Sequence, residues 1–284
     1  MPPPALQVDH ATVAGRDLPS MQQALSAAGI VCEYGGPHSN HATEMALASF
    51  PDGSYLELIA LQPHADPKAV DEHYWKAFLR GDAGPCAWAA RSSDVAAEVR
   101  RLRAADVEVT GPFRSGRQRP DGVRLDWETA QIGAGPSGTF FPFLIRDYTP
   151  RANRAFPGGK PTTTNLTGVS KVVLGARNLD EAIHSFLRAY GLADPLRRDD
   201  SAFGAKLAWF KGSPIAIAAP LDAQSWITHR LDQFGEIPCA FVLARASEGR
   251  YRTKPGGDWF GHRIDWMDPL PTGWRLGLEQ VSSP

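Results

Sequence analysis

The sequence predicts an α+β protein in which four β-α-β-β-β modules are paired in two domains. One observation behind this prediction is that the same order of strand-like and helix-like segments recurs along the 284 residues. Another is that short words recur in both halves in the same order. Pro-Cys-Ala-Trp at 85–88 is similar to Pro-Cys-Ala-Phe at 238–241, and Arg-Leu-Asp-Trp at 124–127 is similar to Arg-Ile-Asp-Trp at 263–266. A repeat of this length indicates domain duplication rather than a solenoid of short repeats.

A third observation is a segment rich in proline and glycine, residues 149–164, which separates halves of similar length. It has no periodic apolar pattern, as is usual for connections between domains. We therefore expect a first domain at residues 1–148, a linker at 149–164 and a second, degenerate domain at 165–284.

The first module shows the order most clearly. A strand is expected at 8–14, and a helix between Asp17 and the stop residue Gly29. The helix is indicated by apolar residues at helical spacing, namely Met21, Ala24, Leu25 and Ala28. Further strands are expected at 30–34, 41–50 and 54–61, with the turn Pro51-Asp52-Gly53 between the last two.

The later modules repeat this order. Asp94 and Asn178 stand at the expected starts of two helices, where side-chain acceptors cap free backbone N–H groups. An extra helix is expected at 66–80. The expected strands lie at 86–91, 108–110, 123–132, 139–145, 169–175, 203–211 and 215–217, and the second-half helix at 181–190.

Side-chain parity in the strand at 54–61 separates a polar face from an apolar one. Tyr55, Glu57 and Ile59 share one face, because successive residues of a strand point to opposite sides. The other face is expected to pack on a helix. The predicted core between sheet and helix consists of Leu56, Leu58, Val13, Leu25 and Met21.

Composition excludes several classes of protein. Thirty basic and 31 acidic residues give a formal net charge of −1, which argues against binding to nucleic acid. No apolar run is long enough to span a bilayer, and the first residues show no secretory signal, so a cytoplasmic protein is expected. Three cysteines without CxxC spacing argue against a disulfide framework and a structural zinc site. No P-loop, nucleophile elbow or dinucleotide-binding word is present.

Modules of this order, paired into a domain, resemble the vicinal oxygen chelate superfamily, and most closely its glyoxalase-like domain branch. The superfamily includes glyoxalase I, extradiol dioxygenases and bleomycin-resistance binding proteins. The second half is similar in order and spacing but keeps few of the words. The resemblance is carried by Val-Asp-His at 8–10, Arg-Asp-Leu at 16–18, Gly-Gly-Pro-His at 35–38, Tyr-Leu-Glu-Leu-Ile at 55–59, Arg-Pro-Asp-Gly at 119–122 with Trp127, and Pro-Phe-Leu-Ile at 142–145.

The resemblance implies a curved sheet around a cleft, with metal ligands on the first and fourth strands of each module. His10 and Glu57 occupy these places in the first module. They would hold one divalent metal ion that polarises an oxygenated substrate. His38 or His41 would supply a third ligand. The alternative is that His10 and Glu57 form a hydrogen-bonded pair, or an acid/base pair, in a polar cleft.

The repeat allows the ligand places to be counted in the other modules. The place of His10 is taken by Ala87, Lys171 and Ala240, and the place of Glu57 by Pro142, Ala216 and Gly277. Only the first module carries ligand residue types at both places, so the functional cleft is expected in the first domain. Lys171 is interpreted as an exposed strand residue rather than a cleft cation, because lysines are mostly solvated.

Other residues are assigned by type and position. The expected substrate-binding residues are His38, His41, Tyr55, Trp127 and Phe140. Aromatic residues on the strands favour a planar or apolar small molecule. His73, on the extra helix, is expected at the surface rather than as a ligand. His64, His184, His229 and His262 receive no role.

Two functions from different classes follow. The first is an enzyme, a lyase, isomerase or dioxygenase of the vicinal oxygen chelate type, in which His10 and Glu57 act on a small oxygenated substrate as metal ligands or acid/base groups. The second is a metal-free protein that sequesters an aromatic or cationic small molecule. In both cases the partner is a small molecule, with neither nucleic acid nor membrane involved. The second domain would be structural or would form a homodimer surface.

Overall fold

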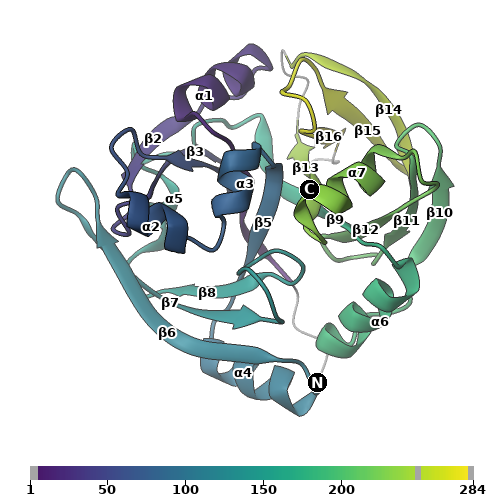
Figure 1. The fold of residues 1–284 in the computed structure, drawn as a ribbon, viewed down its shortest axis with the longest axis horizontal. Helices are drawn as coiled ribbons and strands as arrows, with labels where there is room; N and C mark the ends of the chain where they lie inside the picture. Colours follow the sequence, from purple (N-terminus) through teal and green to yellow (C-terminus); the bar gives the residue numbers. More distant parts are fainter. Residues whose placement is uncertain (1–5, 247–250, 281–284) are drawn as a thin grey trace.

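The computed structural model describes residues 6–246 and 251–280, and its strands form two eight-stranded mixed sheets (Figure 1). Both sheets have the same strand order, which is β2-β3-β4-β1-β5-β8-β7-β6 in the first and β10-β11-β12-β9-β13-β16-β15-β14 in the second. This correspondence confirms the predicted α+β fold and the internal duplication. No helix in the described ranges is long and apolar enough to cross a membrane.

The first sheet lies within residues 8–147 and joins two modules through its central strands. β1 pairs in parallel with β4 and antiparallel with β5, so the modules meet at β1 and β5. The bounds are β1 Val8–Ala14, β2 Glu33–Pro37, β3 Thr43–Ser49, β4 Tyr55–Leu61, β5 Gly84–Arg91, β6 Val109–Gln118, β7 Arg124–Ile132 and β8 Phe143–Asp147.

Two long helices cover the convex face of this sheet. α1 (Leu18–Ala27) is capped by Asp17, whose carboxylate accepts from the backbone N–H of Ser20 at 2.9 Å. α4 (Val95–Ala104) is capped in the same way by Asp94. The predicted core is confirmed, because all five residues are buried in one cluster under these helices, namely Val13, Met21, Leu25, Leu56 and Leu58. The predicted extra helix is two short helices, α2 (Pro67–Glu72) and α3 (Lys76–Gly81).

The second sheet repeats the first but its last module differs. α6 (Leu179–Tyr190) follows β9, as predicted, whereas only residues 246–252 lie between β13 and β14. α7 (Trp226–Phe234) instead precedes β13, at the place that α2 and α3 occupy in the first half. The strand bounds are β9 Leu166–Gly175, β10 Leu196–Asp200, β11 Ala205–Trp209, β12 Ile215–Pro220, β13 Pro238–Arg245, β14 Thr253–Trp259, β15 His262–Met267 and β16 Leu276–Gln280.

The two halves share one apolar core. Phe186 of α6 packs on Phe140 and Phe141 of the first half, with ring centroids 5.3 and 4.9 Å apart. Arg101 of α4 donates to the backbone carbonyl of Ala189 in α6 at 2.7 Å. The helix of the third module therefore packs against the second module as well as its own sheet.

The segment predicted as a linker contains a helix and is attached to the first sheet. This helix, α5 (Arg151–Ala155), follows β8 after a short turn. Arg119 donates to the backbone carbonyls of Asn153 and Pro157, at 2.8 and 2.6 Å. Farther along, Thr162 and Ser49 exchange hydrogen bonds of 3.0 to 3.2 Å. These contacts hold α5 against the sheet and so position the two arginines described below.

We expect Leu58→Ala to lower the free energy of unfolding by about 2–5 kcal/mol, since it leaves a cavity in a close-packed core. Leu58 is fully buried between β4 and the helices, whereas Val31 is 58% exposed. Val31→Ala is therefore the matched control and should change the stability by less than about 0.5 kcal/mol. Urea denaturation followed by circular dichroism measures both. Equal effects of the two substitutions would contradict the assigned core.

Candidate functional site

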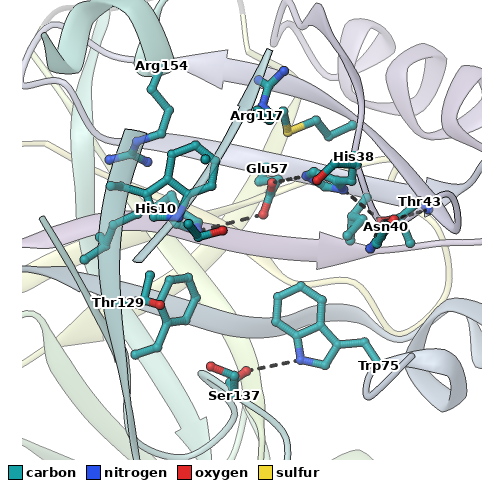
Figure 2. Close-up of a pocket in the computed structure, with 18 of the residues that line it drawn as sticks. His10, His38, Asn40, Thr43, Glu57, Trp75, Arg117, Thr129, Ser137 and Arg154 are labelled. Carbon is teal, nitrogen blue, oxygen red and sulfur yellow. Dashed lines mark hydrogen bonds and ion pairs between the residues drawn. The ribbon is translucent and has the colours of Figure 1, made fainter. Parts of the chain in front are cut away.

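The concave face of the first sheet surrounds a cavity of about 310 Å³. Strands β1, β3, β4, β6, β7 and β8 contribute side chains to it, and so do the loop before β3 and the segment between α2 and α3. Figure 2 shows Glu57 near the centre, with His10 on one side and His38 on the other. The cleft predicted for the first domain is therefore present, and both predicted ligand places open into it.

His10 is oriented by its neighbour in the sequence. Its Nδ1 lies 2.6 Å from Oδ1 of Asp9, although adjacent residues of a regular strand point to opposite faces. The register of β1 against β5 shifts between Val8 and His10, so Asp9 is the extra residue of a β-bulge. The bulge allows both side chains to approach one another. The ionised carboxylate accepts the Nδ1 proton, so that the neutral ring has its lone pair on Nε2.

Asp9 is fully buried and bound to two arginines from α5. Arg154 donates to its two oxygens at 2.9 and 3.0 Å, and Arg151 forms a further ion pair. Both arginines also contact Asp147 at the end of β8. Burial alone would raise the pKa of Asp9, but the charge of Arg154 and the hydrogen bonds from His10 and Arg154 hold it well below its usual value. Asp9 therefore stays ionised.

Glu57 lies between two imidazole rings. Its Oε2 is 3.9 Å from Nε2 of His10 and accepts from the Thr12 hydroxyl at 3.2 Å, while Oε1 is 3.5 Å from Nε2 of His38. Burial would raise the pKa of this carboxyl, but the interaction with His38, the charge of His10 and the Thr12 bond outweigh it and lower the pKa to about 2. Glu57 is thus a buried carboxylate at neutral pH.

A short loop holds His38 in place. Nδ1 of His38 lies 2.8 Å from the Thr43 hydroxyl, which Asn40 also contacts at 3.2 Å. The side-chain amide oxygen Oδ1 of Asn40 accepts from the backbone N–H groups of Ala42 and Thr43, at 2.9 and 3.1 Å. Polar contacts therefore run without interruption from the loop through His38, Glu57 and His10 to Asp9.

His73 is not at the surface, and the prediction that placed it there is wrong. It is 8% exposed and lines the cavity, because the chain turns inward where α2 ends. Its Nδ1 accepts from the backbone N–H of Trp75 at 3.1 Å, which leaves the proton on Nε2. Burial lowers the pKa of His73, and the nearby His38 lowers it further, so the ring is neutral at neutral pH.

The structure separates the five expected substrate-binding residues into two groups. His38, Tyr55 and Trp127 line the cavity, and Tyr55 stacks on the His10 ring with centroids 4.8 Å apart. His41 is exposed beside the loop and does not line the cavity. Phe140 faces away from it and packs on Phe186.

Sequence reasoning missed Asp9, Arg154 and Arg117, all of which lie at the site. Arg154 comes from the presumed linker, and its guanidinium also donates to the Tyr55 hydroxyl at 2.6 Å. Arg117 lines the cavity from β6 and is 6% exposed. The sequence around Arg117 carries no signal that separates it from the other arginines of this segment, Arg114 and Arg119.

The structure brings the predicted metal ligands His10 and Glu57 together as a pair rather than as part of a larger ligand cluster. In the described ranges no group of three or more His, Cys, Asp or Glu side chains is placed to hold an ion. His10 and His38 approach different oxygens of the same carboxylate, from opposite sides.

The strand register shows which residue of the second module corresponds to Glu57. Ala89 of β5 pairs with Phe143 of β8, just as Thr12 of β1 pairs with Glu57 of β4 in the first module. Phe143, not Pro142 as counted, therefore takes the place of Glu57 and offers no ligand atom.

The interior of the second sheet is packed with side chains where the first has its cavity. Four aromatic residues meet there, namely Phe203, Trp209, Trp259 and Trp266. Lys171 is 3% exposed, so its interpretation as an exposed residue is wrong. It forms an ion pair with Glu279 and lies 5.1 Å from the centre of the Trp209 ring. A partner carboxylate and an aromatic face together compensate a buried ammonium.

Two curved sheets of paired modules, with a polar cavity on the concave face of one, define a protein of the vicinal oxygen chelate superfamily. Within it, the sequence matches the glyoxalase-like domain family over residues 8–190. The chain belongs to this family. The match continues beyond the first sheet, through β9 and α6. No curated protein matches the sequence significantly.

Solved structures with the same fold have little sequence in common with this chain. A hypothetical protein from Staphylococcus aureus has a TM-score of 0.68 and 15% identity, covering 97% of this chain and 100% of that one. A mutant of 4-hydroxymandelate synthase from Streptomyces coelicolor has a TM-score of 0.58 and 12% identity, covering 100% and 95%. Methylmalonyl-CoA epimerase from Mycobacterium tuberculosis covers 43% of this chain and 92% of its own, with a TM-score of 0.35 and 21% identity. The first two show the fold alone.

We expect the stability difference between the wild type and Glu57→Gln to depend on pH. The pKa of Glu57 is lowered from 4.5 to about 2, so its ionised form stabilises the fold above pH 4.5 and this contribution is lost as the pH falls toward 2. The pH-dependent part is on the order of 3 kcal/mol. Urea denaturation between pH 7 and 3 measures it. Glu72→Gln, at an exposed position, is the control. If the stability difference between wild type and variant is independent of pH for both substitutions, the environment assigned to Glu57 is contradicted.

We expect Lys171→Ala to destabilise the protein by about 3–5 kcal/mol, because it leaves Glu279 buried without its cation. The double variant Lys171→Met, Glu279→Leu should recover most of this loss, because it removes both charges. Neither variant should change ligand binding in the first cavity. Denaturation midpoints of the two variants test the pair. Equal destabilisation by the single and double variants would show that the charges do not compensate one another.

Proposed function

We propose that the protein is an enzyme that moves a proton on a small oxygenated compound bound in the first cavity, with His10 as the acid/base group. The observation that carries this proposal is the position of the His10 ring between two buried carboxylates. Asp9 binds Nδ1 at 2.6 Å, and Glu57 lies 3.9 Å from the free Nε2. A base placed in this way accepts a proton at Nε2 without losing its orientation.

The residues of the cavity suit the abstraction of a proton from a carbon next to a carbonyl group. Nε2 of His10 takes the proton, and Asp9 and Glu57 stabilise the resulting imidazolium from both sides. The negative charge then moves to the carbonyl oxygen of the substrate. His73 keeps a proton on Nε2 and lines the same cavity, so it supplies a neutral donor for that oxygen. Return of the proton from His10 to a different atom of the resulting enolate completes an isomerisation.

Glu57 serves this reaction as a fixed negative charge rather than as the base. Its pKa of about 2 makes it a weak proton acceptor at neutral pH. Tyr55 stacks on His10 in nearly parallel orientation, and Phe143 contacts the ring edge-on. These rings prevent His10 from rotating away from the cavity.

Two alternatives use the same cavity. In the metal-assisted form, His10 and Glu57 would hold a divalent ion, which would supply polarisation of the substrate. It requires stoichiometric metal in the purified protein that is lost in His10→Ala and Glu57→Ala. In the second alternative, the aromatic walls sequester a small molecule without turnover. Metal analysis and the exchange experiment below distinguish these alternatives from the proposal.

We expect His10→Asn to abolish hydrogen–deuterium exchange at a carbon next to a carbonyl group, with a rate loss of about 10²–10⁴. The experiment incubates the protein in D₂O with pyruvate, phenylpyruvate, hydroxyacetone or acetylacetone and follows the loss of the C–H signal by NMR. His64→Asn, at an exposed position outside the cavity, is the control and should exchange like the wild type. Wild-type exchange no faster than that of buffer, together with tight binding, would instead support sequestration.

A further inference from the structure

Arg117 is a buried cation that forms no ion pair with any of the described residues. It lies on β6, lines the cavity and is 6% exposed. Its Nη1 is buried and has no hydrogen-bond partner, and Arg117 forms no ion pair within the described residues. Burial accordingly lowers its pKa, although the group remains a cation. A buried charge without a partner is costly and is seldom kept for stability alone.

The other charges near the cavity are already matched. Asp9 and Asp147 are bound by Arg151 and Arg154. Glu57 faces His10 and His38 and forms no ion pair with Arg117 within 4.0 Å. Figure 2 shows the Arg117 guanidinium at the edge of the cavity opposite Trp75 and Ser137. Arg117 therefore feels the attraction of Glu57 only from beyond ion-pair distance, and no carboxylate of the described residues binds its guanidinium directly.

The backbone near Arg117 keeps other side chains away. Gly36 of β2 has a φ of +99°, and a Cβ there would lie 3.7 Å from Nη1 of Arg117 and 3.1 Å from the Pro120 ring. The two edge strands of the sheet, β2 and β6, thus approach each other beside the guanidinium. Nη1 is thus enclosed beside these strands, where it has no protein acceptor.

The remaining walls and the volume limit the rest of the ligand. Trp75, Trp127 and Phe143 present aromatic surface to the cavity. A volume of about 310 Å³ is at the small end of the range for ligand sites. These walls accept a planar or apolar body of few atoms.

We propose that the ligand of this cavity is a small carboxylate with a planar apolar body, and that Arg117 binds its carboxylate group. A guanidinium offers two parallel N–H donors that match the two oxygens of a carboxylate. The body then extends between the aromatic walls toward His10. The carboxylate would be the substrate of the proposed enzyme. Only the word substrate depends on the proposed function; the binding of a carboxylate by Arg117 does not.

Binding of matched acid and amide probes tests the proposal. The probes are benzoate and phenylacetate, with benzamide and phenylacetamide as their neutral counterparts, and the readout is isothermal titration calorimetry. We expect the wild type to bind each acid about tenfold or more tightly than its amide, and Arg117→Gln to lose this preference. Arg124→Gln, an exposed arginine on β7, should keep it. A wild type without preference for the acids, or an Arg117→Gln variant that retains it, overturns the proposal.

The stability of the ligand-free protein gives a second test that needs no probe. Since Arg117 forms no ion pair with the described residues, Arg117→Met should leave the melting temperature unchanged or raise it. A fall of several degrees would show that Arg117 is structural and would overturn the proposal. His10→Asn should keep the preference for acids, because Arg117 is intact. If the wild type shows no hydrogen–deuterium exchange but still binds the acids more tightly than the amides, the proton-transfer function is rejected and the carboxylate site is not.

Discussion

The buried carboxylate of Asp9 is the group on which the first half of the structure depends. It joins three elements that are distant in sequence: the bulged strand β1, the helix α5 with Arg151 and Arg154, and through Arg154 the end of β8 at Asp147. It also sets the tautomer of His10. Without this charge, Arg151 and Arg154 would keep only Asp147 as a carboxylate partner, and the imidazole would lose its orientation. Fold stability and the chemistry of the cavity thus rest on the same ion cluster.

Comparison of the two sheets shows how duplication produced one hollow and one filled copy. Both sheets share the strand order and an antiparallel central pair flanked by two parallel pairs. Both also have a bulge near the start of the first strand, at Asp9 and at Ser170. In the first copy, glycines and polar residues leave a cavity. In the second copy, large aromatic rings occupy the same concave side, and Lys171 and Glu279 neutralise one another inside it. The concave side of the second copy is therefore occupied by packed side chains.

The sequence was informative where regular periodicity holds. Strand parity placed Glu57 on the concave face, and helical spacing identified the core, because both depend on local backbone geometry. Asp9 was missed because a bulge breaks the alternation of side chains, and His73 was misplaced because the chain turns inward after α2. Arg154 could not be assigned from a segment that looks like a linker. Arg117 was missed because the expected strand covered only residues 108–110, whereas β6 extends from Val109 to Gln118 and carries Arg117 to the cavity.

The packing of α6 on the first half has a consequence for how this chain can be divided. A polypeptide ending after β8 would contain every strand of the hollow sheet, yet it would expose the apolar surface around Phe140 and Phe141 that Phe186 covers. It would also lack α5, so that Asp9 and Asp147 would be left without their cations. We expect such a polypeptide to be less stable than one that continues through α6. This agrees with a family boundary that falls at the end of α6, within the second copy.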